Sequence, residues 1–283
     1  MYDAIITKLS NNSILLEREL SRIFDYEDPD YSKIIEAQRY GLLGGGKRIR
    51  AFLVMELCRL FGGDEKNALP YACAIEMIHA SSLIHDDMPC MDNDDFRRGK
   101  PSTHKAFGES LALLAGDSLI VKAFEIAIRN QHLMIESNAK AVDILSTATG
   151  DSGMLGGQTM DISAASHKLD LESLMRLHSM KTGKLISASA KLGCIAAGVG
   201  EDDERYCSSV KYAESIGLAF QIIDDILDYR EGKSELNSFL AHMSEDEAIS
   251  MANKLTIEGI DAIKPYDDGT LEELATYLIT RNY

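Results

Sequence analysis

Two clusters of aspartates, each closing a long apolar helical stretch, constrain this chain more than any other feature of its sequence. They are Asp86, Asp87 and Asp92 in the first cluster and Asp224, Asp225 and Asp228 in the second. Six carboxylates are too costly to bury among apolar side chains without positive charge nearby. Mg²⁺ suits a ligand set made only of oxygen and is commonly shared with substrate phosphates. The sequence therefore predicts a Mg²⁺ site for a phosphorylated substrate.

The two clusters differ in how their carboxylates can converge. Asp224 and Asp228 are four residues apart and share one helix face, and Asp225 points broadly the same way. An unbroken helix would separate Asp86 from Asp92, but Pro89 interrupts the helix and allows the chain to turn back. The alternative, a solvated acidic helix face, fits poorly because apolar residues flank the second cluster on both sides.

The rest of the chain reads as helix. There are only five prolines, and no stretch alternates between polar and apolar residues as a strand would. We expect helices over about 1–25, 29–43, 47–62, 70–87, 108–129, 138–165, 170–197 and 203–229, with two or three shorter ones after 234. The 138–165 segment contains a glycine-rich break at Gly153, Gly156 and Gly157. No linker or change in composition divides the sequence. We therefore predict an all-α fold in which residues 1–283 form a single domain.

Two groups of cations could bind anions. Lys47 and Arg50 follow three glycines at the expected start of a helix, where cations are unfavourable unless an anion is bound. Arg97 and Arg98 follow the first aspartate cluster, and an arginine can hold phosphate oxygens in a fork. The alternatives are an ordinary basic first turn and a solvated loop.

His79 lies two helical turns before Asp86, on the same face. A single histidine is usually a core residue whose hydrogen bonds are satisfied. Its alignment with the metal-binding face leads us to expect a substrate contact instead.

Composition narrows the range of partners and compartments. The net charge of −16 argues against nucleic acid and against anionic membrane surfaces, both of which select basic patches. The five cysteines form no CxxC pair, and their odd number favours a reducing cytoplasm over a disulfide framework. We see no signal peptide and no apolar run long enough for a transmembrane segment.

The sequence also resembles a known family, the trans-isoprenyl diphosphate synthases, over most of its length. Five motifs in order carry the resemblance: 45–50 (GGKRIR), 86–92 (DDMPCMD) with 97–99 (RRG), 156–161 (GGQTMD), 181–183 (KTG) and 220–228 (FQIIDDILD). The four-residue spacer in the first aspartate motif is similar to that of bacterial farnesyl and plant geranylgeranyl diphosphate synthases. The resemblance implies a bundle of long antiparallel helices around a central cavity, usually in a homodimer.

The resemblance also implies a reaction and a role for each motif. An allylic diphosphate would ionise at Mg²⁺, with about three ions present once substrate is bound, and isopentenyl diphosphate would then add to the cation. Implied contacts of the allylic diphosphate and its cation are Arg97, Lys181, Thr182 and Gln221, and those of isopentenyl diphosphate are Lys47, Arg50, His79 and Arg98. The product would be farnesyl (C15) or geranylgeranyl (C20) diphosphate.

Product length should depend on what blocks the growing chain along the helix of the first motif. Ser81, five residues before Asp86, stands where similar farnesyl synthases usually carry an aromatic residue, and Ser82 is also small. We therefore expect a deep pocket and a C20 product, unless a bulky side chain from a neighbouring helix fills it.

One departure from the family pattern concerns the segment after the second aspartate motif. The Gly/Lys-rich loop usual at this point is not seen, because residues 229–232 run almost directly into 233–236. Either the protein lacks a full lid over the diphosphates, or a mobile segment is absent from this sequence. This loss is the one feature that favours a non-catalytic regulatory subunit of a heteromeric synthase. A class I terpene cyclase is a second alternative, although it would not need cations for a second diphosphate.

Overall fold

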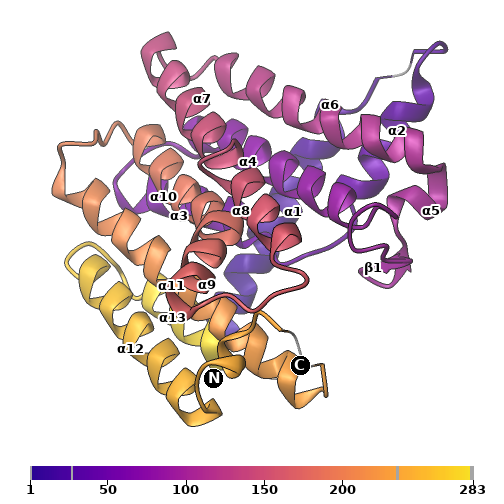
Figure 1. Cartoon of the computed structure of the whole chain (residues 1–283). Coiled ribbons are helices and arrows are strands. Elements are labelled where there is room, and N and C mark those ends of the chain that lie inside the picture. The colour runs from indigo at the N-terminus through magenta and orange to yellow at the C-terminus, as the bar shows by residue number, and fades with distance from the viewer. Residues whose placement is uncertain (1, 27, 234–235, 281–283) are drawn as a thin grey trace.

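The computed structural model describes residues 2–26, 28–233 and 236–280 and confirms an all-α architecture. Long helices pack around a central pair, α4 and α10, as Figure 1 shows. The helices are α1 (Asp3–Ile23), α2 (Ser32–Leu42), α3 (Ile49–Leu60), α4 (Glu65–Asp86), α5 (Thr103–Phe107), α6 (Glu109–Ile128), α7 (Ile135–Thr149), α8 (Met154–Ser163), α9 (Leu171–His178), α10 (Lys184–Ala196), α11 (Glu204–Arg230), α12 (Glu245–Ile263) and α13 (Thr270–Thr280).

The helix of the first aspartate motif, α4, is the centre of the fold. It is apolar on all sides, as expected for a helix surrounded by others, and it packs on α3, α6 and α10. The helix starts earlier than expected, at Glu65 rather than Pro70, because the side chain of Asp64 accepts a hydrogen bond from the Lys66 amide and caps the end.

The helix of the second motif, α11, lies between α10 and α12. Its N-terminus is capped by Asp203, which accepts from the Arg205 amide. The inner face of α11 packs with α12 and with Phe239, the first residue of a 3₁₀ turn that spans Phe239–Ala241. Figure 1 shows α11, α12 and α13 together on one side of the molecule.

The helix expected over 170–197 is divided by one π-helical turn, Ser179–Gly183. Between the helices expected over 70–87 and 108–129, where we expected no regular element, lies a short antiparallel hairpin, with β1 (Phe96–Arg97) paired to β2 (Lys100–Pro101). Arg98 and Gly99 form its turn with positive φ angles of 53° and 75°, the backbone geometry of tight hairpin turns. Within the described residues, no helix is both long enough and apolar enough to cross a membrane.

Candidate active site

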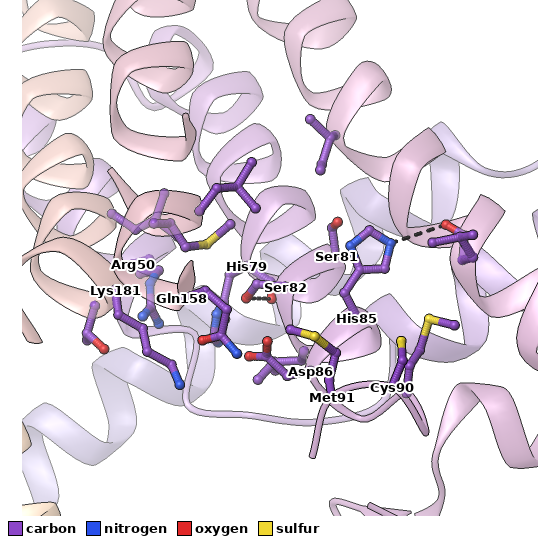
Figure 2. Close-up of a pocket in the computed structure, with 18 residues that line it drawn as sticks. Arg50, His79, Ser81, Ser82, His85, Asp86, Cys90, Met91, Gln158 and Lys181 are labelled. Carbon is purple, nitrogen blue, oxygen red and sulfur yellow. Dashed lines mark hydrogen bonds between the residues drawn. The ribbon is translucent and has the colours of Figure 1, made fainter. Parts of the chain in front are cut away.

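A cavity of about 380 Å³ lies among α4, α6, α8 and the π-helical turn. Its walls are largely apolar, and the apolar residues include Leu113, Ile120, Met154 and Leu185. Polar side chains gather at one end, where Figure 2 shows Lys181 and Gln158 reaching toward the same region as Asp86. This combination suits a ligand with a charged head and an apolar tail.

The first aspartate motif turns back on itself, as the position of Pro89 predicted. Helix α4 ends at Asp86, and the Asp92 amide donates a 2.9 Å hydrogen bond to the Asp86 carbonyl. Met88 accepts from the amides of Met91 and Asn93, which closes the turn further. The turn therefore brings the backbones of Asp86 and Asp92 together without help from a ligand.

The carboxylates of the first motif have different environments. Asp87 is 2% exposed and accepts hydrogen bonds from Arg97, at 2.8 Å from its Nε atom. Asp86 faces the cavity, where burial raises the pKa of its carboxyl to about 6 although Lys181 opposes the shift. Asp92 is exposed, and its pKa is also raised by partial desolvation. Asp87 and Arg97 thus pair with each other, whereas no ion pair of Asp86 or Asp92 is found among the described residues.

The π-helical turn presents Lys181 and Thr182 to the cavity. Helix α8 approaches this turn closely, because a Cβ atom on Gly157 would lie 2.2 Å from the backbone nitrogen of Lys181. The approach places Asp161 beside Lys181, with 2.5 Å between Oδ2 and Nζ. Single π-helical turns are frequent at functional sites.

Asp161 was not among the site residues expected from the sequence. It was visible as the last residue of the 156–161 motif, but its helix contains no cluster of carboxylates that would have drawn attention to it. In the structure, Asp161 and Asp92 line the same hollow beside the main cavity, and the negative charge of Asp161 adds to the desolvation that raises the pKa of Asp92.

A second group of basic side chains adjoins the same cavity. Arg50 and His79 both line the cavity, and Arg98 lies near both of them. Burial and the neighbouring arginines hold the pKa of His79 well below its usual value, so the imidazole is neutral. Burial and Arg98 likewise lower the pKa of Arg50, against the opposing charge of Glu76. An anion placed here would compensate both arginines.

The residues 47–50 are arranged differently from the expectation. Helix α3 begins at Ile49, so Lys47 precedes the helix, where its ammonium lies 5.3 Å from the centre of the Tyr277 ring. One amide in the first turn of α3 is unavailable to an anion, because the Ala51 amide donates a 3.2 Å hydrogen bond to the Glu76 carboxylate. Arg48, with a positive φ of 52°, points into the core and pairs with Glu76 at 3.1 Å.

The second aspartate motif lies on α11 outside the lining of the main cavity. Asp228 pairs with Lys233 at 3.0 Å, and Asp225 accepts from the Phe239 amide at 2.7 Å. The sequence placed all three carboxylates broadly on one face, whereas Asp225 faces the segment that follows the helix. Gln221 lies beside the ring of His178, which comes directly before the π-helical turn.

The described residues contain no group of three histidine, cysteine or acidic side chains already gathered around one point. The donor chemistry of Asp86 and Asp92 nevertheless fits Mg²⁺, which prefers oxygen ligands. Asp86 lines the main cavity and Asp92 the adjoining hollow, and desolvation raises the pKa of both carboxyls. A divalent cation that brings phosphate oxygens with it would complete the ligand set from outside the protein.

The two serines expected to limit product length both line the cavity. Ser81 is fully buried, and in the described part of the chain its Oγ atom has no hydrogen-bond partner. Ser82 donates to the His79 carbonyl at 2.9 Å. Figure 2 shows Ser81 deeper than Asp86 along α4, so a larger side chain at Ser81 would reduce the depth of the cavity.

Comparison with known proteins gives concordant matches. Residues 32–270 match the sequence profile of the family described as Polyprenyl synthetase. The chain is 41% identical to the heterodimeric geranylgeranyl pyrophosphate synthase large subunit 1 of Arabidopsis thaliana, over 99% of this chain and 77% of that protein. It is 37% identical to a geranylgeranyl diphosphate synthase of Cyanophora paradoxa, over 98% and 97% of the two chains. The structure is similar to that of an FPP/GFPP synthase from Zymomonas mobilis, with a TM-score of 0.91, 35% identity and coverage of 99% and 100%.

Proposed function

Since this chain belongs to the polyprenyl synthetase family, we propose that it condenses an allylic diphosphate with isopentenyl diphosphate into a linear C15 or C20 prenyl diphosphate. One observation carries the proposal: one apolar cavity is lined by Asp86 and Lys181 and also by Arg50 and the neutral imidazole of His79, with the Arg98 guanidinium close to both. The diphosphate groups of two substrates and the apolar tail of one of them need such an arrangement. A terpene cyclase, which takes one diphosphate, would not.

We propose Mg²⁺ as the cofactor, about three ions with substrate bound, held by Asp86 and Asp92 of the first motif and by Asp224 and Asp228 of the second. When bound, Mg²⁺ neutralises the diphosphate and stabilises it as a leaving group. Arg97 and Lys181 would contribute further positive charge at the same end of the cavity, which stabilises charge on the departing pyrophosphate.

The reaction then proceeds in three bond changes. The C–O bond of the allylic diphosphate breaks, and the electron pair leaves with pyrophosphate. The double bond of isopentenyl diphosphate, held by Lys47, Arg50, His79 and Arg98, attacks the allylic cation and forms the new C–C bond. Pyrophosphate takes the proton that is lost to restore a double bond. Thr182 and Gln221 are proposed to face the cation, and the apolar walls exclude water that would quench it.

We favour a C20 product over C15. Ser81 leaves the cavity open along α4, in contrast to a bulky residue at this position. Ile120 and Met154 line the cavity from neighbouring helices and are proposed to limit further growth.

We further propose that the chain acts as one catalytic domain, residues 1–283, in a homodimer within a reducing compartment such as the cytoplasm. Helix α6 supports the homodimer, because Leu114, Val121 and Ile128 are exposed along it and would be covered by a second copy. All five cysteines are free thiols, which suits a reducing compartment.

The deciding experiment incubates the purified chain with dimethylallyl or farnesyl diphosphate, isopentenyl diphosphate and Mg²⁺, followed by chromatography of the products. A longer linear prenyl diphosphate supports the proposal. A hydrocarbon would indicate a terpene cyclase, and no turnover would indicate a regulatory subunit.

A further inference from the structure

A segment between α11 and α12 is held in place by a dense set of hydrogen bonds. We call residues 237–241 the strap. The side-chain amide of Asn237 donates to the carbonyls of Ala164 and His167, at 2.8 and 3.3 Å, and its oxygen accepts from the Leu169 amide at 2.8 Å. Lys168 donates to the Ala241 carbonyl as well. These hydrogen bonds join both ends of the strap to the connection between α8 and α9.

Asp225 holds the strap from the other side. Its Oδ2 atom accepts from the Phe239 amide at 2.7 Å, and the Ser238 hydroxyl also lies within hydrogen-bonding reach. Burial raises the pKa of this carboxyl to about 6 against the effect of those two donors. A carboxylate that satisfies the first amide of a 3₁₀ turn stabilises that turn.

Phe239 connects the strap to the reacting groups. Its side chain is fully buried and stacks on His178, with 5.1 Å between ring centres and 21° between planes. His178 is the last residue of α9 and comes directly before the π-helical turn that carries Lys181. Gln221 of α11 lies against the same ring. The stacked pair therefore stands between the two elements that supply Lys181 and Gln221.

We propose that the strap positions Lys181 and Gln221 through the Phe239–His178 stack, and that Asp225 anchors the strap rather than binding a metal ion. The inference rests on the proposed function for the roles of Lys181 and Gln221. It makes Asp225, Asn237 and Phe239 positioning residues, since none of them lines the main cavity.

Paired substitutions in the second motif separate an anchor from a metal ligand. Asn at 225 keeps a carbonyl oxygen for the Phe239 amide, whereas Leu does not. We expect the kcat of Asp225→Asn to stay within about threefold of the parental value. The kcat of Asp225→Leu should fall by at least about tenfold, because a buried hydrogen bond is lost. Asp224→Asn, at a proposed metal ligand, should instead raise the Mg²⁺ concentration needed for half-maximal activity. The same Mg²⁺ shift in Asp225→Asn would overturn the inference.

Amide hydrogen exchange tests the anchor without any turnover. The Phe239 amide should exchange faster in Asp225→Leu and at the parental rate in Asp225→Asn. Equal protection in all three proteins would refute the anchor. Because this readout needs no substrate, an inactive parent chain would count against the proposed function alone.

The stack is tested by Phe239→Leu, which keeps an apolar side chain but removes the ring. We expect kcat to fall while the KM for isopentenyl diphosphate stays unchanged, because Lys47 and Arg50 lie on other elements. Phe61→Leu is the matched control, since Phe61 packs on Tyr266 away from the cavity. If Phe239→Leu changes the unfolding temperature without changing kcat, the strap only stabilises the fold and the inference fails.

Discussion

Ser81 is proposed to set the depth of the cavity, where its small side chain is buried and its hydroxyl has no hydrogen-bond partner among the described residues. A tyrosine at this position would fill the space below Asp86 and stop the tail after fewer condensations. We expect Ser81→Tyr to shift the product from C20 toward C15, measured by chromatography of the dephosphorylated alcohols. Ser81→Ala is the control and should keep the parental product. An unchanged distribution in Ser81→Tyr would refute the assignment of Ser81 to the end of the tail pocket.

His178 makes stability depend on pH. Burial lowers the pKa of its imidazole to about 4 in the folded protein, from an ordinary value of 6.5. The unfolded chain therefore binds more protons between pH 4 and 6.5, so stability falls as the pH drops through this window and is unaffected above it. From pH 7 to pH 5 the loss should be about 2 kcal/mol.

Urea unfolding of the parent and of His178→Phe at both pH values measures this effect. Asp86 and Asp225, whose pKa values are raised to about 6, act in the opposite direction in part of the same window. Their contribution cancels when the two proteins are compared. The parent should lose more stability than His178→Phe, and equal losses would contradict a neutral buried imidazole.

Residues differ in how far the sequence could place them. The return of Asp92 to Asp86 was predictable, because Pro89 acts on its immediate neighbours. The inward direction of Arg48 was not, because its partner Glu76 is 28 residues away and nothing local marks the pair. For the same reason Asp225 could not be distinguished from Asp224 and Asp228: the Phe239 amide that it binds belongs to a different element.

At the level of elements, the close contact between α8 and the π-helical turn fixes the position of the Lys181 backbone. Gly157→Ala would place a methyl group 2.2 Å from a backbone nitrogen, so the two elements must separate. We expect a loss of about 1–3 kcal/mol in the free energy of unfolding and a fall in kcat as Asp161 moves away from Lys181. Gly200→Ala is the control, because a methyl group there meets no atom within 4 Å. Parental kcat in Gly157→Ala would contradict this role.

The helices themselves were largely predictable, since apolar periodicity and caps such as Asp203 are local signals. The π-helical turn was not, because the 170–197 segment shows an uninterrupted helical pattern. The hairpin at β1 and β2 was also missed, since its strands are too short to show alternation.

At the scale of the whole molecule, the exposed apolar side of α6 is the surface that a second copy would cover. Val121 is 67% exposed near the middle of this helix. We expect Val121→Glu to convert the proposed homodimer to a monomer, measured as a halved mass by light scattering during size-exclusion chromatography. Ile257→Glu, on α12 and also exposed, is the control and should leave the mass unchanged. A dimer that survives in Val121→Glu would place the interface elsewhere.

The hydrogen bond from the Asp92 amide to the Asp86 carbonyl has a consequence for the affinity of the proposed Mg²⁺ site. A chelating loop usually loses conformational freedom when it closes on a cation, and the affinity is reduced by that entropy. In this protein the loop is already wound when the chain folds, so cation capture requires little further ordering there. Mutations that loosen the loop, such as a glycine in place of Pro89, should therefore weaken ion affinity without removing a single ligand.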